Sequence, residues 1–273
     1  METELAATAR ATAAWRAVES ARAAALFHDP WAAALAGQAT VSQLASQPPD
    51  VQARAASYTI VRTRFFDDWL TSQADRRQVV LLGAGFDTRA FRLAWPAGTT
   101  LWELDQPAVL AAKDAALAGE RPSAGCTRRT LAADLTGPAW PQALLEAGLA
   151  VDQPTVWLAE GLLPYLEPPA VETLLGQVSD LSAAGSRLGA DLVTEGFMAA
   201  RNAYVATLAP AVAPWQVVAL FHSGTDAPAA LLGHHGWRLE RLTHPGASDA
   251  DFGRWVGPAE LGAGFLLVAA VRG

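Results

Sequence analysis

Residues 78–105, QVVLLGAGFDTRAFRLAWPAGTTLWELD, hold the pattern that decides the fold. The apolar, β-branched run at 79–82 ends at Gly83 and Gly85, which predicts a buried parallel strand followed by a tight glycine turn. A short helix is expected next, and a second strand is expected over 99–104. The stretch therefore predicts an α/β fold that begins with strand, turn, helix and strand.

Polar side chains in the same stretch indicate what the turn can bind. Asp87 or Thr88 can accept the first backbone N–H groups of the helix, and Glu103 and Asp105 close the second strand. Glycines let a ligand approach the backbone where a Cβ would clash, and a carboxylate at the end of the second strand can accept both ribose hydroxyls. The combination favours a nucleoside-binding half-site, and the alternative is a purely structural turn.

Two absent features narrow the choice of nucleotide. A dinucleotide fingerprint would place a third glycine at position 88, where the chain has Thr88, and the Gly-Lys-Ser/Thr of a phosphate loop occurs nowhere in the sequence. Both absences disfavour a pyrophosphate ligand. S-adenosylmethionine carries adenine and ribose but no phosphate, so it fits a site with a glycine turn and a ribose acid.

Six blocks of the chain occur in a recognisable order. They are ESARAAALFHDPW (19–31), VRTRFFDDWL (61–70), GAGFDTRAFRL (83–93), LWELDQPAVLAAK (101–113), AADL (132–135) and AEGLLPYL (159–166). Together they resemble the leucine carboxyl methyltransferase family of class I S-adenosylmethionine-dependent enzymes, in particular its bacterial small-molecule branch, which includes polyketide carboxyl O-methyltransferases. The resemblance runs from about residue 20 to the C-terminus.

The resemblance implies a class I methyltransferase Rossmann-like sheet, mostly parallel, with helical additions. Further strands are predicted over 127–133, 155–159 and 187–193. The last two, 237–242 and 264–271, follow one another without a helix, which indicates an antiparallel C-terminal hairpin. Because 273 residues with 51% hydrophobic content can bury one α/β core, a single domain is expected over 1–273. Its parts are a helical cover (1–75), a cofactor core (76–193), a substrate-cover insertion (194–225) and the sheet completion (226–273).

The cover is predicted to be helical in three pieces. A helix is expected through Leu26, a short one ends at Leu35, and a third over 51–72 follows a polar Ser/Gln/Pro linker at 42–50. Apolar residues of the third helix recur every three or four positions and form one face. A cover of this kind is expected to close over the ligand.

The resemblance also implies individual cofactor contacts. Arg62 would hold the methionine carboxylate, for which a planar guanidinium is well suited, and Asp134 with Leu135 would meet the adenine. Glu160 ends the fourth strand beside the first, where ligands of open parallel sheets bind. The expected cofactor-binding residues are Arg22, Arg62, Gly83, Gly85, Glu103, Asp105, Asp134, Leu135 and Glu160. The alternatives are solvated arginines at 22 and 62 and a helix N-cap at Asp134.

Aromatic residues gather in the segment after the fifth strand, between Thr194 and Ser223. Several such residues at the binding edge are expected to wall a pocket for an apolar substrate. The expected substrate contacts are Phe197, Met198, Tyr204, Trp215 and Phe221. Tyr165, in the LLPYL that follows Glu160, is placed near the methyl-transfer centre, and core packing is its alternative.

Composition excludes several classes of partner and site. The net charge of −7 offers no electrostatic footprint for nucleic acid, and no run is long enough to span a membrane. Cys126 is the only cysteine, so no intrachain disulfide can form and a cytoplasmic location is expected. The adjacent His234 and His235 cannot share one metal on a helix, so no metal site is expected, and His222 is the best candidate for a base.

The expected reaction is methylation of a carboxylate of an apolar small molecule. A carboxylate is ionised at neutral pH, whereas a phenol with a pKa near 10 needs a base or a metal, and the sequence shows neither a His-Asp dyad by spacing nor a metal cluster. Three alternatives stay open. They are a phenol or alcohol O-methyltransferase that uses His222, a protein C-terminal carboxyl methyltransferase, and a cofactor-binding module without catalysis. The oligomeric state is not indicated by the sequence.

Overall fold

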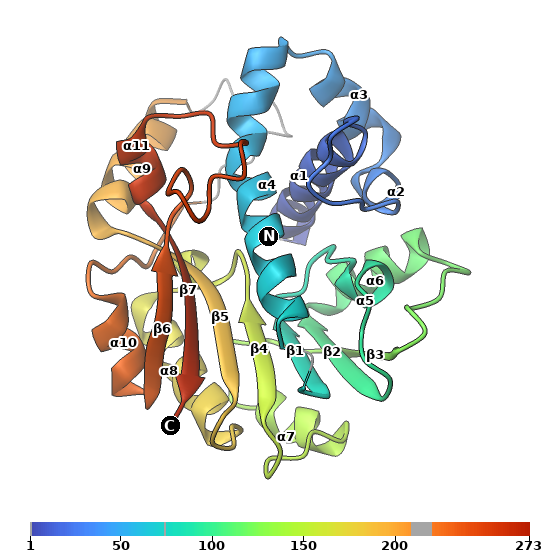
Figure 1. The fold of residues 1–273 in the computed structure, drawn as a ribbon, viewed down its shortest axis with the longest axis vertical. Coiled ribbons are helices and arrows are strands. Elements are labelled where there is room, and N and C mark those ends of the chain that lie inside the picture. Colours follow the sequence, from blue (N-terminus) through green and yellow to red (C-terminus); the bar gives the residue numbers. More distant parts are fainter. Residues whose placement is uncertain (1, 74, 209–219) are drawn as a thin grey trace.

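The structure, a computed structural model, describes residues 2–73, 75–208 and 220–273. At its centre is a mixed sheet in the order β3-β2-β1-β4-β5-β7-β6 (Figure 1). Strands β1 to β5 are parallel, and β7 lies antiparallel between β5 and β6. The strands are β1 Gln78–Leu82, β2 Thr99–Asp105, β3 Cys126–Ala132, β4 Thr155–Ala159, β5 Arg187–Val193, β6 Trp237–Thr243 and β7 Phe265–Arg272. The expected class I methyltransferase sheet with an antiparallel C-terminal pair is confirmed. The connection within that pair was predicted to contain no helix, which is wrong, because the short helix α11 Ala259–Ala263 precedes β7.

Burial on both faces explains why the central strands are continuously apolar. Along β1, Val79 and Leu81 join the core packed against the N-terminal helices, while Val80 and Leu82 join the core on the opposite face. Successive side chains of a strand point to opposite faces, so a run without polar residues is required when helices cover both.

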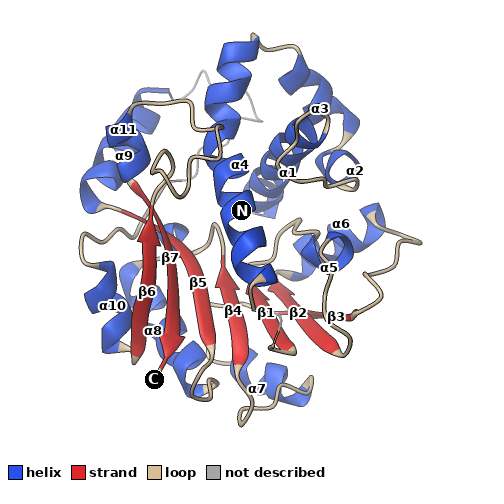
Figure 2. Cartoon of the chain, in the orientation of Figure 1, coloured by secondary structure: helices blue, strands red, loops and turns tan. Residues whose placement is uncertain are grey.

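Helices cover both faces of the sheet and gather beyond the end where the parallel strands stop (Figure 2). One core packs the sheet against α1 to α6, and the other packs it against α7, α8 and α10. The helices are α1 Glu2–Ser20, α2 Ala32–Ala36, α3 Gln38–Ala45, α4 Pro49–Thr71, α5 Arg89–Arg92, α6 Pro107–Ala116, α7 Trp140–Glu146, α8 Pro168–Asp180, α9 Glu195–Leu208, α10 Pro228–His234 and α11 Ala259–Ala263, with a short 3₁₀ turn at Leu163–Tyr165.

The N-terminal cover differs from the sequence prediction in two places. Helix α1 ends at Ser20 rather than at Leu26, because the carboxylate of Glu19 accepts the backbone N–H of Leu26 at 2.9 Å and folds the chain back. The predicted linker at 42–50 is helical in its first part, where α3 extends to Ala45. Helix α3 buries Leu44 in the core, although most of the other residues of this helix are polar.

The sheet order brings three chain segments to one edge. Strand β1 pairs with β2 on one side and with β4 on the other, so the residues that follow these strands lie together. Gly83, Asp105 and Glu160 are at or just after the carboxyl ends of the three strands. This edge lies beneath α1 and α4 and is where ligands bind in open α/β sheets.

Candidate functional site

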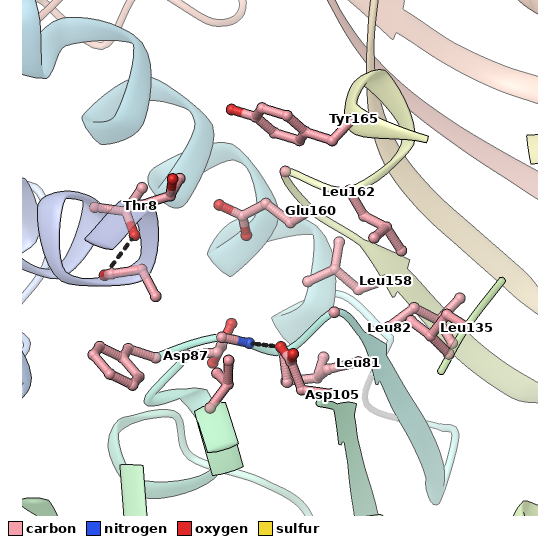
Figure 3. A pocket seen from close by; sticks show the side chains of 18 of the residues that line it. Thr8, Leu81, Leu82, Asp87, Asp105, Leu135, Leu158, Glu160, Leu162 and Tyr165 are labelled. Atoms are coloured by element: carbon pink, nitrogen blue, oxygen red, sulfur yellow. Dashed lines mark hydrogen bonds between the residues drawn. The ribbon is translucent and has the colours of Figure 1, made fainter. Parts of the chain in front are cut away.

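A cavity of about 420 Å³ opens at this edge of the sheet (Figure 3). Its floor comes from the ends of β1, β2 and β4, and its roof comes from α1 and α4. The expected residues that line it are Arg62, Gly83, Gly85, Asp105, Asp134, Leu135, Glu160 and Tyr165. Segments 8–16 and 58–63 of the cover therefore meet strand ends that are far away in the sequence.

The glycine turn forms the floor of the cavity in a conformation that favours glycine. Gly83 has a φ of +65° and Gly85 a φ of +48°, both in the left-handed region. A Cβ on Gly83 would lie 3.1 Å from Cδ1 of Leu162, which also lines the cavity. The side chain of Asp87 then accepts the backbone N–H of Arg89 at 2.6 Å and so begins α5. Because Gly83 and Gly85 have no side chains, a ligand can lie directly against the backbone of the turn.

Asp105 is held at the mouth of the turn by two backbone donors. Its Oδ2 accepts the N–H of Gly85 at 2.6 Å, drawn as a dashed line in Figure 3, and its Oδ1 accepts the N–H of Gln106 at 2.7 Å. Burial raises the pKa of Asp105, and these hydrogen bonds oppose the shift. Each carboxylate oxygen has a second lone pair, so the group can still accept two ribose hydroxyls.

Asp134 and Leu135 follow β3 on the other side of the cavity. The Oδ1 of Asp134 accepts both the N–H and the hydroxyl of Thr136, at 2.9 and 2.6 Å, and these bonds lower its pKa. The helix N-cap that was the alternative interpretation is not formed, because α7 begins at Trp140 with Ala139 as its N-cap. Asp134 instead closes a local turn with Thr136. It uses one carboxylate oxygen only, so the other can accept an exocyclic amine, while the buried Leu135 packs beside it.

Glu160 joins two arginines across the cavity. The Nε of Arg62 donates to its Oε1 at 2.9 Å, and Nη1 of Arg89 donates to its Oε2 at 2.6 Å. Burial works against the charge on Arg62, but Asp191, Tyr58 and Glu160 outweigh it and keep its pKa well above the ordinary value. Arg62 has five N–H donors and uses two in these carboxylate contacts, so others remain for a ligand carboxylate.

Arg89 was not predicted as a site residue, yet it is the most buried cation of the cavity wall. It is 2% exposed, and its guanidinium also pairs with Asp67 and Asp87. Burial alone would raise the pKa of Asp87, but Arg89, Lys113 and Arg92 lower it to about 2. The signal in the sequence was the block DTRAFR, whose two arginines follow an acid directly after the glycine turn.

Tyr165 lies at the end of the cavity beyond Glu160 (Figure 3). Burial raises the pKa of its hydroxyl, so the group stays protonated at neutral pH. Behind it, five rings follow one another with centroids 3.8 to 6.5 Å apart, and they end at Tyr58, which also lines the cavity. These rings are Tyr165, Phe221, Phe197, Phe265 and Tyr58. They form an aromatic wall behind this end of the cavity.

The expected substrate residues contribute to this wall to different degrees. Phe221 and Phe197 belong to it but do not line the cavity themselves. Met198 is half-buried on α9 and Tyr204 is 64% exposed, and neither lines the cavity. Trp215 lies outside the described residues. The guanidinium carbon of Arg201, a residue that was not predicted, lies 3.8 Å from the ring centroid of Phe221.

Glu103 was expected beside Asp105 but does not line the cavity. Glu103 lies two residues before Asp105 in β2 and is fully buried. Its carboxylate pairs with Lys113 at 2.7 Å and with Arg128 at 2.8 Å. The two strand-end acids therefore have different surroundings. Asp105 faces the ligand space, and Glu103 compensates two cations inside the protein.

Arg22 and His222 also lie away from the cavity. The side chain of Arg22 is half exposed beyond the end of α1 and contacts Glu19 at 3.5 Å. The ring of His222 lies 3.0 Å from a carboxylate oxygen of Glu167, and its side chain is 42% exposed. The structure thus brings neither residue to the ligand space that the strand ends define.

No group of three or more His, Cys, Asp or Glu within 2–73, 75–208 and 220–273 is arranged to hold a metal ion. Among the helices in the same ranges, none combines the length and apolar character of a membrane span.

Comparison with known proteins identifies relatives over most of the chain. A family model described as leucine carboxyl methyltransferase matches residues 9–179. A Streptomyces coelicolor protein assigned as an S-adenosyl-L-methionine-dependent methyltransferase is 42% identical over 240 residues, which cover 85% of this chain and 82% of that protein. A Frankia alni protein with the same assignment is 41% identical over 262 residues, covering 93% and 90% of the two chains.

Solved structures show the same fold at low sequence identity. A DUF574 family protein from Streptomyces avermitilis aligns with a TM-score of 0.59 and 16% identity, over 96% of this chain and 97% of that one. Magnesium protoporphyrin IX methyltransferase from Synechocystis, solved with bound S-adenosylhomocysteine, aligns with a TM-score of 0.51 and 14% identity, over 84% and 89% of the two chains.

Proposed function

The chain belongs to the leucine carboxyl methyltransferase family, and we propose that it converts a carboxylate of an apolar small molecule to its methyl ester. That it is an S-adenosylmethionine-dependent methyltransferase follows from the family and from its relatives. The alternative of a binding module without catalysis is therefore set aside. The proposal concerns the acceptor and the residues that serve it.

The cavity residues fit the cofactor group by group. S-adenosylmethionine supplies, when bound, a methyl group that its sulfonium makes electrophilic. We assign Gly83 and Gly85 to the backbone approach of the nucleoside and Asp105 to the ribose hydroxyls. We assign the carboxylate of the methionine moiety to Arg62, whose guanidinium can accommodate it bidentately. Asp134 and Leu135 would meet the adenine, and Glu160 would orient the cationic end of the ligand.

The observation that carries the carboxylate proposal is that the described cavity wall leaves no base free for the acceptor, since Asp105 and Asp134 are assigned to the cofactor. Among the described residues that line it, none is a histidine, lysine or cysteine. Its tyrosines Tyr58 and Tyr165 have raised pKa values because they are buried, so they act as donors. Glu160 is tied to two arginines, and Asp87 has a pKa of about 2, which makes it a poor base. Such a site suits an acceptor that arrives already ionised.

The acceptor would occupy the end of the cavity at Tyr165. Leu162 and Leu166 line this end together with Tyr58, and the aromatic wall lies behind it. Apolar contacts here can remove a ring system from water, worth roughly 25 cal/mol for each Å² of apolar surface. The Tyr165 hydroxyl can donate to one carboxylate oxygen, while positioning and exclusion of water accelerate transfer to the other.

Product chemistry tests the proposal most directly. The enzyme would be incubated with methyl-labelled S-adenosylmethionine and a panel of aromatic acids, phenols and short peptides. We expect label in an ester, which mild alkali hydrolyses with release of labelled methanol. The rate should not fall as the pH drops through the histidine range near 6.5.

The phenol alternative makes the opposite forecast for His222. His222→Ala should keep most of its activity, and the exposed His234→Ala serves as the matched control. A histidine base would instead cost about 10²- to 10⁴-fold in rate. An alkali-stable ether, formed at a rate that titrates near pH 6.5 and is lost in His222→Ala, would refute the carboxylate proposal. Label in the peptides alone would point to a protein carboxyl terminus.

We further propose a role in natural-product biosynthesis, because the cavity end is apolar and aromatic rather than charged. A cytoplasmic location is proposed on the single cysteine, since Cys126 has no intrachain partner for a disulfide.

A further inference from the structure

Asp191 is a buried acid that lies directly behind the cavity wall. It is in the middle of β5, is 2% exposed and does not line the cavity. Its Oδ2 accepts the hydroxyl of Tyr58 at 2.6 Å and Nη1 of Arg62 at 3.0 Å, and its Oδ1 accepts the backbone N–H of Gly161 at 2.5 Å. One carboxylate thus joins α4 to the turn that follows β4.

Gly161 brings the backbone close to the guanidinium of Arg62. It has a φ of +67°, and a Cβ built on it would lie 3.2 Å from Nη1 and 3.3 Å from Nη2 of Arg62. Any side chain at this position would press on the guanidinium and would be strained in this conformation. Asp191 accepts the N–H of the same residue, so it holds both the cation and the backbone beneath it.

The remaining contacts of Arg62 fix the plane of its guanidinium. Arg62 donates its Nε–H to Glu160 at 2.9 Å and an Nη1–H to Asp191. Two different carboxylates therefore fix the orientation of the guanidinium plane. Tyr58 packs its ring against Phe265 with a centroid distance of 3.8 Å, and its raised pKa keeps its hydroxyl a donor to Asp191. A free arginine side chain has many rotamers, and a ligand that binds it must remove this entropy unless the protein has already done so.

We propose that Asp191 is a positioning residue for the cofactor: it orders Arg62, with Tyr58 and Gly161, so that the guanidinium meets the carboxylate of the methionine moiety without rearrangement. The inference rests on the proposed role of Arg62 and not on the identity of the acceptor. It deepens the proposed function, because a cofactor held at its methionine end has its methyl group fixed relative to Tyr165.

The experiment measures binding of two cofactors by calorimetric titration, first to four proteins and then to Arg62→Lys alone and combined with Asp191→Asn. The cofactors are S-adenosylmethionine and its decarboxylated form, which lacks the carboxylate that Arg62 would bind. The proteins are the wild type, Asp191→Asn, Tyr58→Phe and the control Asp180→Asn, which changes an exposed acid at the end of α8. We expect Asp191→Asn to weaken S-adenosylmethionine about 10-fold and the decarboxylated form less than about 2-fold.

Tyr58→Phe removes one donor to Asp191 but keeps the ring against Phe265, so it should fold even if Asp191→Asn does not. It should weaken S-adenosylmethionine about 3-fold with the same selectivity against the decarboxylated form. Combining Asp191→Asn with Arg62→Lys should give less than the product of the single effects, since both changes act on one interaction.

Equal losses for the two cofactors in Asp191→Asn and in Tyr58→Phe would show that Asp191 only holds the fold together and would overturn the proposal. Multiplicative effects in the double variant would overturn it as well. Because no acceptor is present in these titrations, either result leaves the ester or ether outcome of the product assay unaffected. The two proposals can therefore fail separately.

Discussion

Replacing Asp105 with Asn tests the proposed ribose contact with the least change of shape. The carboxylate accepts Gly85 N–H at 2.6 Å with one oxygen and Gln106 N–H at 2.7 Å with the other. An Asn side chain keeps one acceptor, but its amide group is a donor and must face one of these N–H groups. One backbone donor and, in the proposed contact, one ribose hydroxyl thereby lose a charged acceptor.

The expected loss of affinity follows from these contacts. A hydrogen bond to a charged group contributes about 1.5–3 kcal/mol, and Asp105→Asn removes such a bond from the ribose while it loosens the turn. A cost of about 2–3 kcal/mol corresponds to roughly 30- to 150-fold weaker binding of S-adenosylmethionine. Because burial raises the pKa of Asp105, affinity of the wild type should also begin to fall at a higher pH than for an ordinary carboxyl.

Calorimetric titration of the wild type, Asp105→Asn and the exposed control Asp152→Asn checks this expectation. A cofactor analogue without the 2′-hydroxyl sharpens it, because the wild type should discriminate against the analogue and Asp105→Asn should discriminate much less. Binding to Asp105→Asn within twofold of the wild type would remove this residue from the ribose site. Unchanged discrimination between the two cofactors would do the same.

Four further changes test other parts of the site. Gly85→Ala places a side chain at a φ of +48° and should cost about 1–2 kcal/mol, measurable by urea unfolding; an unchanged midpoint would contradict the left-handed turn. The carboxyl of Asp87 has a folded pKa of about 2 against an ordinary 3.8, so it stabilises the fold above pH 4 by about 2 kcal/mol, a contribution lost as the pH falls from 4 to 2. Asp87→Asn should flatten that part of the acid unfolding curve, and an identical curve would count against the ion pair. Arg89→Met leaves three acids without their shared cation and should destabilise by about 3–5 kcal/mol in the same unfolding assay, with a loss below 1 kcal/mol speaking against the network. Arg22→Ala should leave the Kd for S-adenosylmethionine within twofold, and a larger effect would restore it to the site.

Features that depend on local apolar pattern could be predicted from the sequence. Strands β4 and β5 begin and end at the predicted residues, because runs such as TVWLA are buried on both faces and stop at polar residues or glycine. Helix α3 was missed for the opposite reason. Half of its sequence QATVSQLA is polar and only Leu44 is fully buried, so its helical conformation depends on packing against α1 and α2.

The ion pairs of the site could not be predicted, because their partners are far apart in the sequence. Arg89 meets Glu160 across 71 residues, and Arg62 meets Asp191 across 129. Residue type indicates that a buried arginine needs an acid, but not which acid the sheet will bring to it. One signal was available for Asp191, since it is the only charged residue within the apolar stretch LGADLV of a predicted central strand.

The charges of this network explain why cover and cavity form together. Arg62, Arg89 and Arg92 come from the helices α4 and α5, while Glu160 and Asp191 come from the sheet. With Asp67 and Asp87 included, four acids surround three arginines, so the network carries one excess negative charge. If α4 moved away, it would take Arg62 and Asp67 with it, and Asp191 and Arg92 would be left without their charged partners. The contacts that hold the cover on the sheet thus share residues with the lining of the ligand space, namely Arg62, Arg89 and Glu160. The excess negative charge of the network suits a ligand with a sulfonium and an ammonium group. Binding of such a cationic ligand neutralises the charge that the three arginines do not balance.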